Sequence, residues 1–252
     1  MFHSNAYLFE YGQKAVKNSR QNSSNRNLFA AILHETEKDQ PTLTDLDVIL
    51  EAGNLIVAGS HTTAHTLTWL IWAVLSQQKL QQQLEEEVGA LDDDFDEAAL
   101  EDLPLLNAAI SENLRLYGAA PGSLPQGVLN GGATLSGHFI LAGITVSTQS
   151  WTIHRDENLF PNTETFDVSP WLPGSNQVSD KAKAAYSPFG VGARNCVGIR
   201  LAWMELRLAA AEFFRECKGV RLSPRATPES MKPENYFTIA PVGHRCGILA
   251  NA

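Results

Sequence analysis

The sequence is poor in positive charge, in cysteine and in apolar residues at its start. Its 252 residues contain 19 Lys and Arg against 28 Asp and Glu, which gives a net charge of −9. This balance excludes the basic surface that nucleic acid or an anionic membrane attracts, so we expect no nucleic-acid partner. Three widely spaced cysteines argue against a disulfide framework and favour a reducing compartment. The polar start lacks the apolar core of a signal peptide, which predicts an intracellular protein without an N-terminal anchor.

What the chain does contain is a globular composition, with a helical first half and a mixed second half. Hydrophobic residues make up 44% and charged residues 19%, enough to bury a sizeable core. The periodic patterns predict helices in the following segments: part of the chain before Asn27, Leu28–Glu37, Asp45–Gln78, Gln77–Leu91, Leu105–Tyr117 and Val197–Glu216. Short apolar runs broken by Gly and Pro between Gly118 and Ser150 predict small β-hairpins, one of them turning at Ala142-Gly143. The fold class is therefore α+β, mainly α.

One segment of the long helix, Leu55–Leu75, contains no Asp, Glu, Lys or Arg and is long enough to cross a bilayer. Polar side chains crowd its middle, where hydrocarbon disfavours them most, and no basic cluster flanks either end. The pattern therefore favours a helix through a folded core, with a single membrane span as the alternative. His61 and His65, four residues apart, could also form half of a zinc site, but no Glu follows His61 as the His-Glu-x-x-His motif requires.

The most informative stretch is a glycine-bearing loop that delivers a cysteine directly before an amphipathic helix. Its fixed positions are Phe189, Gly190, Gly192, Arg194, Cys196 and Gly198. The first turn of a helix presents unpaired N–H groups and a partial positive charge, which together stabilise a thiolate. The glycines allow tight turns and the close approach of a flat group. A thiolate held in this way is a ligand for iron.

With every fixed position filled, this loop resembles the haem-binding loop of the cytochrome P450 superfamily. The resemblance implies that Cys196 is the axial ligand of a haem iron. It also implies that Arg194 pairs with a haem propionate and that Phe189 packs beside the iron–sulfur bond. Gly190, Gly192 and Gly198 would also belong to the haem-binding set, as would Ala58 and Gly59 in the motif described next.

Two further motifs are similar to motifs of this family and follow in its order. The run from Ala58 through Gly59 and His61 to Thr62 is similar to the Ala-Gly-x-Asp/Glu-Thr motif on the helix that crosses the distal haem face. In the family, that Thr and its acidic neighbour manage protons, and here His61 stands in the acidic position. Glu112 and Arg115 are similar to the Glu-x-x-Arg motif, whose i, i+3 spacing lets the two side chains pair on one helix face.

A fourth segment departs from the family pattern. Phe166–Trp171 aligns with Phe-x-Pro-x-Arg-Trp, but Val168 and Pro170 replace the Pro and the Arg. That Arg normally completes a triad with the Glu-x-x-Arg pair, so we expect Glu112 and Arg115 to form a two-member network. Arg155 is a conceivable substitute for the missing guanidinium.

The resemblance covers essentially the whole chain but only the C-terminal half of a family member. It implies a single partial cytochrome P450 domain over residues 1–252, and the stretches after Arg115 look most like fungal members of secondary metabolism. The implied function is a haem-dependent monooxygenase that uses O2, an apolar organic substrate and electrons from an NADPH-dependent reductase. The chain has no Gly-x-Gly-x-x-Gly fingerprint of its own for a flavin or dinucleotide. Family members often sit on the endoplasmic reticulum membrane. The alternative is a truncated, non-catalytic remnant that does not retain haem.

Overall fold

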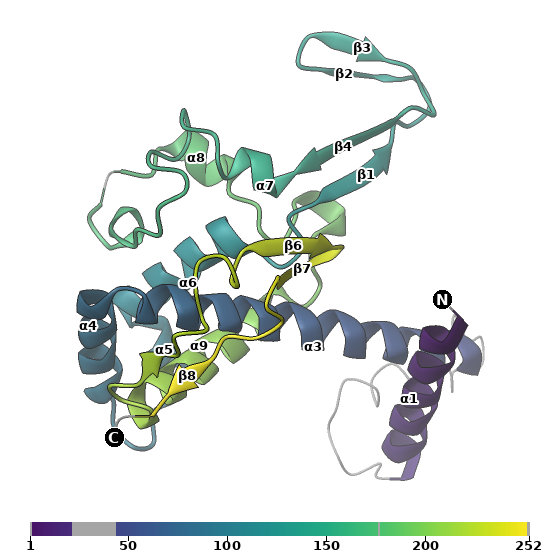
Figure 1. Cartoon of the computed structure of the whole chain (residues 1–252). Helices are drawn as coiled ribbons and strands as arrows, with labels where there is room; N and C mark the ends of the chain where they lie inside the picture. Colours follow the sequence, from purple (N-terminus) through teal and green to yellow (C-terminus); the bar gives the residue numbers. More distant parts are fainter. Residues whose placement is uncertain (1, 22–43, 176, 251–252) are drawn as a thin grey trace. The chain divides into compact units, whose positions relative to one another are not determined.

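The computed structural model describes residues 2–21, 44–175 and 177–250, which form two compact units (Figure 1). The first unit runs to His61 and the second begins at Thr62, within one helix. The helix predicted at Leu28–Glu37 lies outside the described residues. Helices dominate and small antiparallel sheets accompany them, which confirms the predicted mainly α, α+β class. The single partial domain over residues 1–252 stays a prediction.

The first unit contains helix α1 (Phe2–Gln21) and the start of helix α3 (Asp45–Leu75). The two segments pack closely at Gly12, where a Cβ would lie only 2.2 Å from the carbonyl oxygen of Ile49. The lack of a side chain at Gly12 therefore permits this approach. The beginning of α3 is fixed by a capping pair. The Thr44 hydroxyl accepts a hydrogen bond from the N–H of Asp47, and the Asp47 carboxylate accepts one from the N–H of Thr44.

The second unit is built on a helical core. The end of α3 packs with α4 (Gln78–Gly89), α5 (Glu97–Glu101), α6 (Pro104–Tyr117) and α9 (Ile199–Glu216). The bounds of α3, α4, α6 and α9 agree with the predicted helices to within a few residues, whereas α5 was not predicted. An apolar stripe of α6 is buried, and its members are Leu106, Ile110 and Leu114. Burial of such a stripe, more than intrinsic propensity, stabilises a helix in a protein.

The long helix α3 does not bury its whole uncharged segment. Trp69, Leu70 and Val74 are fully buried, whereas the residues from Ala58 to His61 are exposed. Hydroxyl groups along the helix donate to carbonyl oxygens four residues earlier, as Ser60 does to Ile56 at 2.6 Å. No helix in the described ranges is long and apolar enough to cross a membrane.

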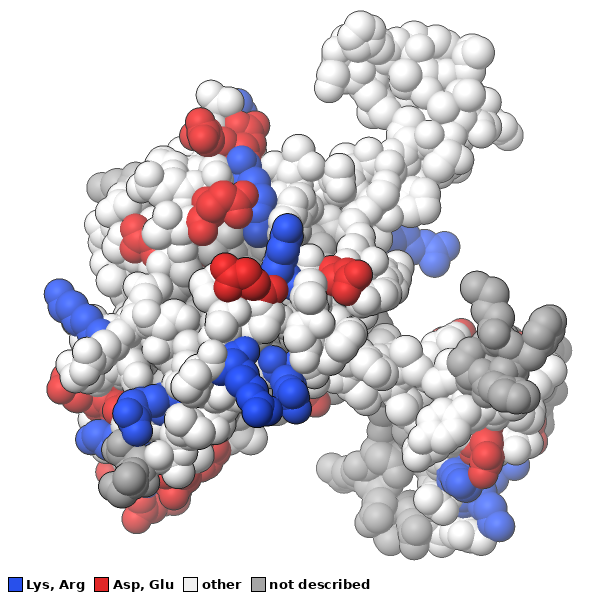
Figure 2. All heavy atoms as spheres, viewed as in Figure 1, with Lys and Arg blue, Asp and Glu red and all other residues white. Residues whose placement is uncertain are grey.

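Short helical turns and two-stranded sheets connect the main helices in the described chain. The turns are α7 (Ser150–Ile153), η1 (Ser169–Trp171), α8 (Asp180–Ala185) and η2 (Gly192–Arg194). Each sheet is a two-stranded antiparallel pair: β1 (Ser123–Gly127) with β4 (Thr145–Gln149), β2 (Ala133–Leu135) with β3 (His138–Ile140), β5 (Arg221–Leu222) with β8 (Ile248–Leu249), and β6 (Pro233–Tyr236) with β7 (Thr238–Pro241). The projection formed by β1 to β4 is free of charged side chains (Figure 2).

The hairpin predicted around Ala142-Gly143 is wrong in its pairing. A turn does form there, but β3 pairs with β2 and β4 pairs with β1. The tight hairpin instead closes at Ser136 and Gly137, which have φ angles of 50° and 82°. Two successive residues with positive φ form the turn that matches the twist of paired strands. The Ala142-Gly143 turn instead connects β3, of the β2–β3 pair, to β4, of the β1–β4 pair.

Candidate haem-thiolate site

The cysteine loop is closed by its own backbone. The N–H of Cys196 donates to the carbonyl of Phe189 at 2.8 Å, and the N–H of Gly190 donates to that of Ser187 at 3.0 Å. Gly190 and Gly192 have φ angles of +73° and +76°, a region that side chains with a Cβ rarely adopt. The two glycines are therefore required by the path of the loop.

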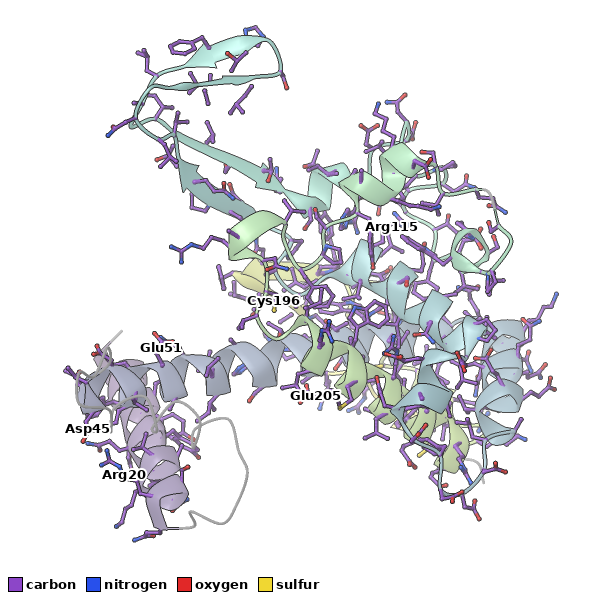
Figure 3. The ribbon with its side chains drawn as sticks, turned by 180° about the vertical axis from the view of Figure 1, so that it is seen from behind. Arg20, Asp45, Glu51, Arg115, Cys196 and Glu205 are labelled. Carbon is purple, nitrogen blue, oxygen red and sulfur yellow. The ribbon has the colours of Figure 1, made fainter. Side chains whose placement is uncertain are left out.

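The Cys196 side chain is exposed and lies in the loop that enters α9 (Figure 3). Gly198 is the N-cap residue of α9, and a Cβ there would come 3.9 Å from the Cys196 sulfur. The thiol thus faces away from the core at the positive end of an 18-residue helix. A cysteine in this position is accessible as a metal ligand.

The surroundings of the thiol suit a flat apolar group. Val191, Val197 and Leu201 expose 66%, 89% and 53% of their surface around Cys196 in the sequence. No cluster of three metal-binding side chains occurs in the residues that the structure describes. An exposed cysteine sulfur with exposed apolar side chains beside it in the sequence is a donor set that fits a haem, which has apolar faces and an iron that a thiolate can ligate.

The other loop residues take up different positions. Arg194 is exposed on η2, two residues before the thiol, so its guanidinium is available to an anionic group. Phe189 is half-buried and packs against the helical core. Phe189 therefore anchors the loop on one side, while Arg194 and Cys196 remain accessible on the other.

Glu112 and Arg115 form the predicted pair, and both side chains are only 3% exposed. The guanidinium is bidentate, with Nε 2.8 Å from Oε2 and Nη2 2.7 Å from Oε1 of the carboxylate. Arg115 also donates to three carbonyl oxygens of the segment after α7, those of His154, Thr163 and Thr165. A buried charged pair with every donor occupied fixes that segment against α6.

The expected two-member network is wrong, because the carboxylate of Glu112 has further partners. The indole Nε1 of Trp171 donates to Oε2 at 2.8 Å, and the backbone N–H of Asp167 donates to Oε1 at 3.1 Å. Arg155 is not the substitute: it pairs with Glu164, donates to the carbonyl of Leu116 and lies over the Trp151 ring. Pairing between segments this far apart in sequence could not be read from the motif alone.

His154 is a site residue that the sequence patterns did not single out. It is 1% exposed, its Nδ1 lies 3.2 Å from the carbonyl oxygen of Arg115, and its Nε2 accepts from the N–H of Ser187 at 3.0 Å. Burial lowers the pKa of His154 to about 4, and the nearby Arg115 and Arg155 act in the same direction. The only sequence signal was its place directly before Arg155 and Asp156.

The distal motif is divided between the two units. Ala58, Gly59 and His61 are exposed in the first unit, and a Cβ on Gly59 would meet nothing within 4 Å. Thr62 begins the second unit and is half-buried, and its carbonyl accepts from the Thr66 hydroxyl at 2.8 Å.

Comparison with known proteins identifies the family. The family model for cytochrome P450 matches residues 2–246. Cytochrome P450 monooxygenase cypX of Dothistroma septosporum is 46% identical over 100% of this chain and 50% of its own length. Cytochrome P450 monooxygenases aflV of Aspergillus parasiticus and stcB of Emericella nidulans are 45% and 44% identical, each over 98% of this chain and over 50% and 48% of their own lengths. The chain spans about half the length of these fungal relatives, and it belongs to the cytochrome P450 family.

Proposed function

We propose that the chain carries the haem-binding part of a monooxygenase that inserts one oxygen atom of O2 into a small apolar organic substrate, in fungal secondary metabolism. The observation that carries the proposal is the exposed thiol of Cys196 at the start of α9, in a loop closed by backbone hydrogen bonds. The named relatives are monooxygenases and are fungal. Because the chain spans half of their length, the activity, the substrate and the partners are all part of the proposal.

The loop residues have separate tasks in this account. The Cys196 thiolate ligates the haem iron, and the exposed Arg194 guanidinium pairs with a carboxylate at the edge of the haem. Phe189 holds the loop to the core, and the absence of a side chain at Gly198, where a Cβ would lie 3.9 Å from the sulfur, leaves that side of the thiolate open. Gly190 and Gly192 allow the positive φ angles that the path of the loop requires. When bound, haem supplies the iron that activates O2 with electrons from an NADPH-dependent reductase.

In this proposal the motif on α3 that runs from Ala58 to Thr62 delivers protons. The Thr62 hydroxyl orders the proton donors, and His61 supplies the proton in place of the acid that the family usually has. An imidazole can relay protons because it changes charge near neutral pH. Ala58 and Gly59, one helical turn earlier, keep that helix face free of bulky side chains.

Glu112 and Arg115 act at a distance, as a structural pair. Through the three carbonyl oxygens that Arg115 binds, the pair fixes the segment that leads from α7 toward the cysteine loop. We expect an intracellular protein that meets its reductase and substrate inside the cell.

The second candidate is a chain that does not retain haem. The observation in its favour is that Val168 and Pro170 replace the family's Pro and Arg in the segment that normally supplies a second arginine to Glu112. The exposed apolar side chains around Cys196 would then be an association surface.

Haem uptake separates the two candidates. The full chain is expressed with a haem precursor, purified by size exclusion, and its haem-to-protein ratio is measured. The proposal predicts a ratio approaching one haem per chain in the monomeric fraction. A haem-free or fully aggregated chain would favour the remnant.

A further inference from the structure

The carboxylate of Glu112 is buried and receives hydrogen bonds from three residues. Arg115 donates two of these bonds, Trp171 donates one from its indole and Asp167 donates one from its backbone, at distances of 2.7–3.1 Å. A buried carboxylate without such donors is strongly destabilising. We therefore expect the loss of any donor to Glu112 to lower the free energy of unfolding.

The two added donors come from one compact turn. The N–H of Ser169 donates to the Asp167 carboxylate at 2.9 Å, and the N–H of Trp171 donates to the carbonyl of Val168 at 3.0 Å. Pro170 lies within the short helix η1, where its fixed φ suits a tight helical turn. The residue that replaces the family's arginine thus helps to shape the turn that presents the Trp171 indole to Glu112.

The Trp171 ring also leads toward the cysteine loop. Its centroid lies 4.7 Å from that of Tyr186, which in turn lies 5.4 Å from the ring of His154. Tyr186 is anchored to α6 by its hydroxyl, which donates to the carbonyl of Ser111 at 3.0 Å. His154 accepts from the N–H of Ser187, two residues before Phe189. An unbroken chain of contacts therefore joins Glu112 to the start of the loop that carries Cys196.

We propose that Trp171 is a positioning residue that takes the place of the absent arginine: its indole N–H completes the Glu112–Arg115 network, and its ring braces the entry to the cysteine loop. The neutral indole adds a donor without adding a second buried cation. The charge of the Glu112 carboxylate is therefore matched by the single charge of the Arg115 guanidinium. The effect on the haem thiolate rests on the proposed function, whereas the hydrogen bond itself does not.

The test compares Trp171→Phe, which removes the N–H and keeps an aromatic ring, with Trp151→Phe. Trp151 is the matched control because the centroid of its ring lies 3.4 Å from the guanidinium carbon of Arg155, whereas it is the indole of Trp171 that donates to Glu112. In thermal unfolding of the haem-free full chain, W171F should lower Tm by about 5 °C, and W151F by less than half of that. In a Glu112→Gln background, which removes the charged acceptor, W171F should lower Tm by less than half as much as in the wild type.

A second readout reports on the loop itself. After haem loading, W171F should lose at least half of the thiolate-ligated, strongly red-shifted Soret signal in the reduced carbon-monoxide complex, while W151F keeps it. Equal Tm shifts for the two variants, or an undiminished Soret signal in W171F, would overturn the inference. If the wild-type chain takes up no haem, the proposed function fails, and the haem-free Tm comparison still decides whether Trp171 supports Glu112.

Discussion

The backbone N–H of Ser187 donates a hydrogen bond to Nε2 of His154 across 3.0 Å. A nitrogen that accepts a hydrogen bond carries no proton, so the ring hydrogen sits on Nδ1, which faces the carbonyl of Arg115 at 3.2 Å. The neutral imidazole thus links the end of α6 to the segment that enters the cysteine loop. Burial, which lowers the pKa of His154 to about 4, keeps the ring neutral at pH 7.

Because His154 is neutral in the folded chain, the free energy of unfolding depends on pH. The pKa of His154 is lower in the folded chain than the ordinary value of 6.5, so its contribution is fully present above about pH 6.5 and is lost as the pH falls toward 4. The loss amounts to about 3 kcal/mol at most. Replacing His154 with Gln, which keeps an acceptor but cannot titrate, should flatten the pH dependence of the unfolding free energy, measured in urea between pH 4 and 7.

The control for that series is His138→Gln, since His138 is exposed on β3. The H138Q variant should keep the wild-type slope. A slope for H154Q equal to that of the wild type would show that His154 is not held neutral by burial.

A second prediction concerns the buried ion pair. Arg115→Ala removes the bidentate partner of Glu112 and the donor to three carbonyl oxygens, and leaves a buried carboxylate with only the Trp171 and Asp167 donors. The unfolding free energy should fall by about 3–5 kcal/mol. Arg115→Lys, which keeps the charge but not the planar fork, should fall between Ala and the wild type.

Asp180 and Lys183 provide a matched exposed pair at the same i, i+3 spacing, 3.7 Å apart with both side chains in solvent. Lys183→Ala should change the unfolding free energy by less than about 0.5 kcal/mol. Similar effects for R115A and K183A in chemical denaturation would contradict the view that burial determines how much the Glu112–Arg115 pair contributes to the free energy of unfolding.

A third prediction concerns His61. If His61 relays protons, turnover with a reductase, NADPH and O2 should change between pH 5.5 and 8, where an imidazole changes charge. His61→Gln should lower turnover about tenfold or more and remove this dependence, whereas H138Q should keep it. A flat wild-type pH–rate profile would count against His61 as the proton donor.

The helices could be predicted from local signals. The Thr44–Asp47 capping pair and Pro104 mark the beginnings of α3 and α6, and the apolar stripe of α6 gives its buried face. Such signals lie within a few residues of the position they determine. The cysteine loop was equally readable, because its glycines are required by the backbone path at Gly190 and Gly192.

What could not be predicted depends on contacts between distant segments. The pairing of β1 with β4 across an inserted hairpin contradicts the simple turn at Ala142-Gly143, because strand pairing is set by partners and not by the turn alone. The bond from Trp171 to Glu112 joins residues 59 positions apart. The role of His154 likewise requires the 33-residue connection to Ser187. No local pattern encodes these partners.

The central claim is that Cys196 ligates a haem iron through its thiolate. The most direct measurement is the reduced carbon-monoxide difference spectrum of the haem-loaded full chain and of its Cys196→Ser variant, with Cys217→Ser as the control for loss of a thiol elsewhere. The account predicts a strongly red-shifted Soret band for the wild type and C217S, and its disappearance in C196S. A wild-type band typical of nitrogen ligation, or a red-shifted band that survives in C196S, would contradict it.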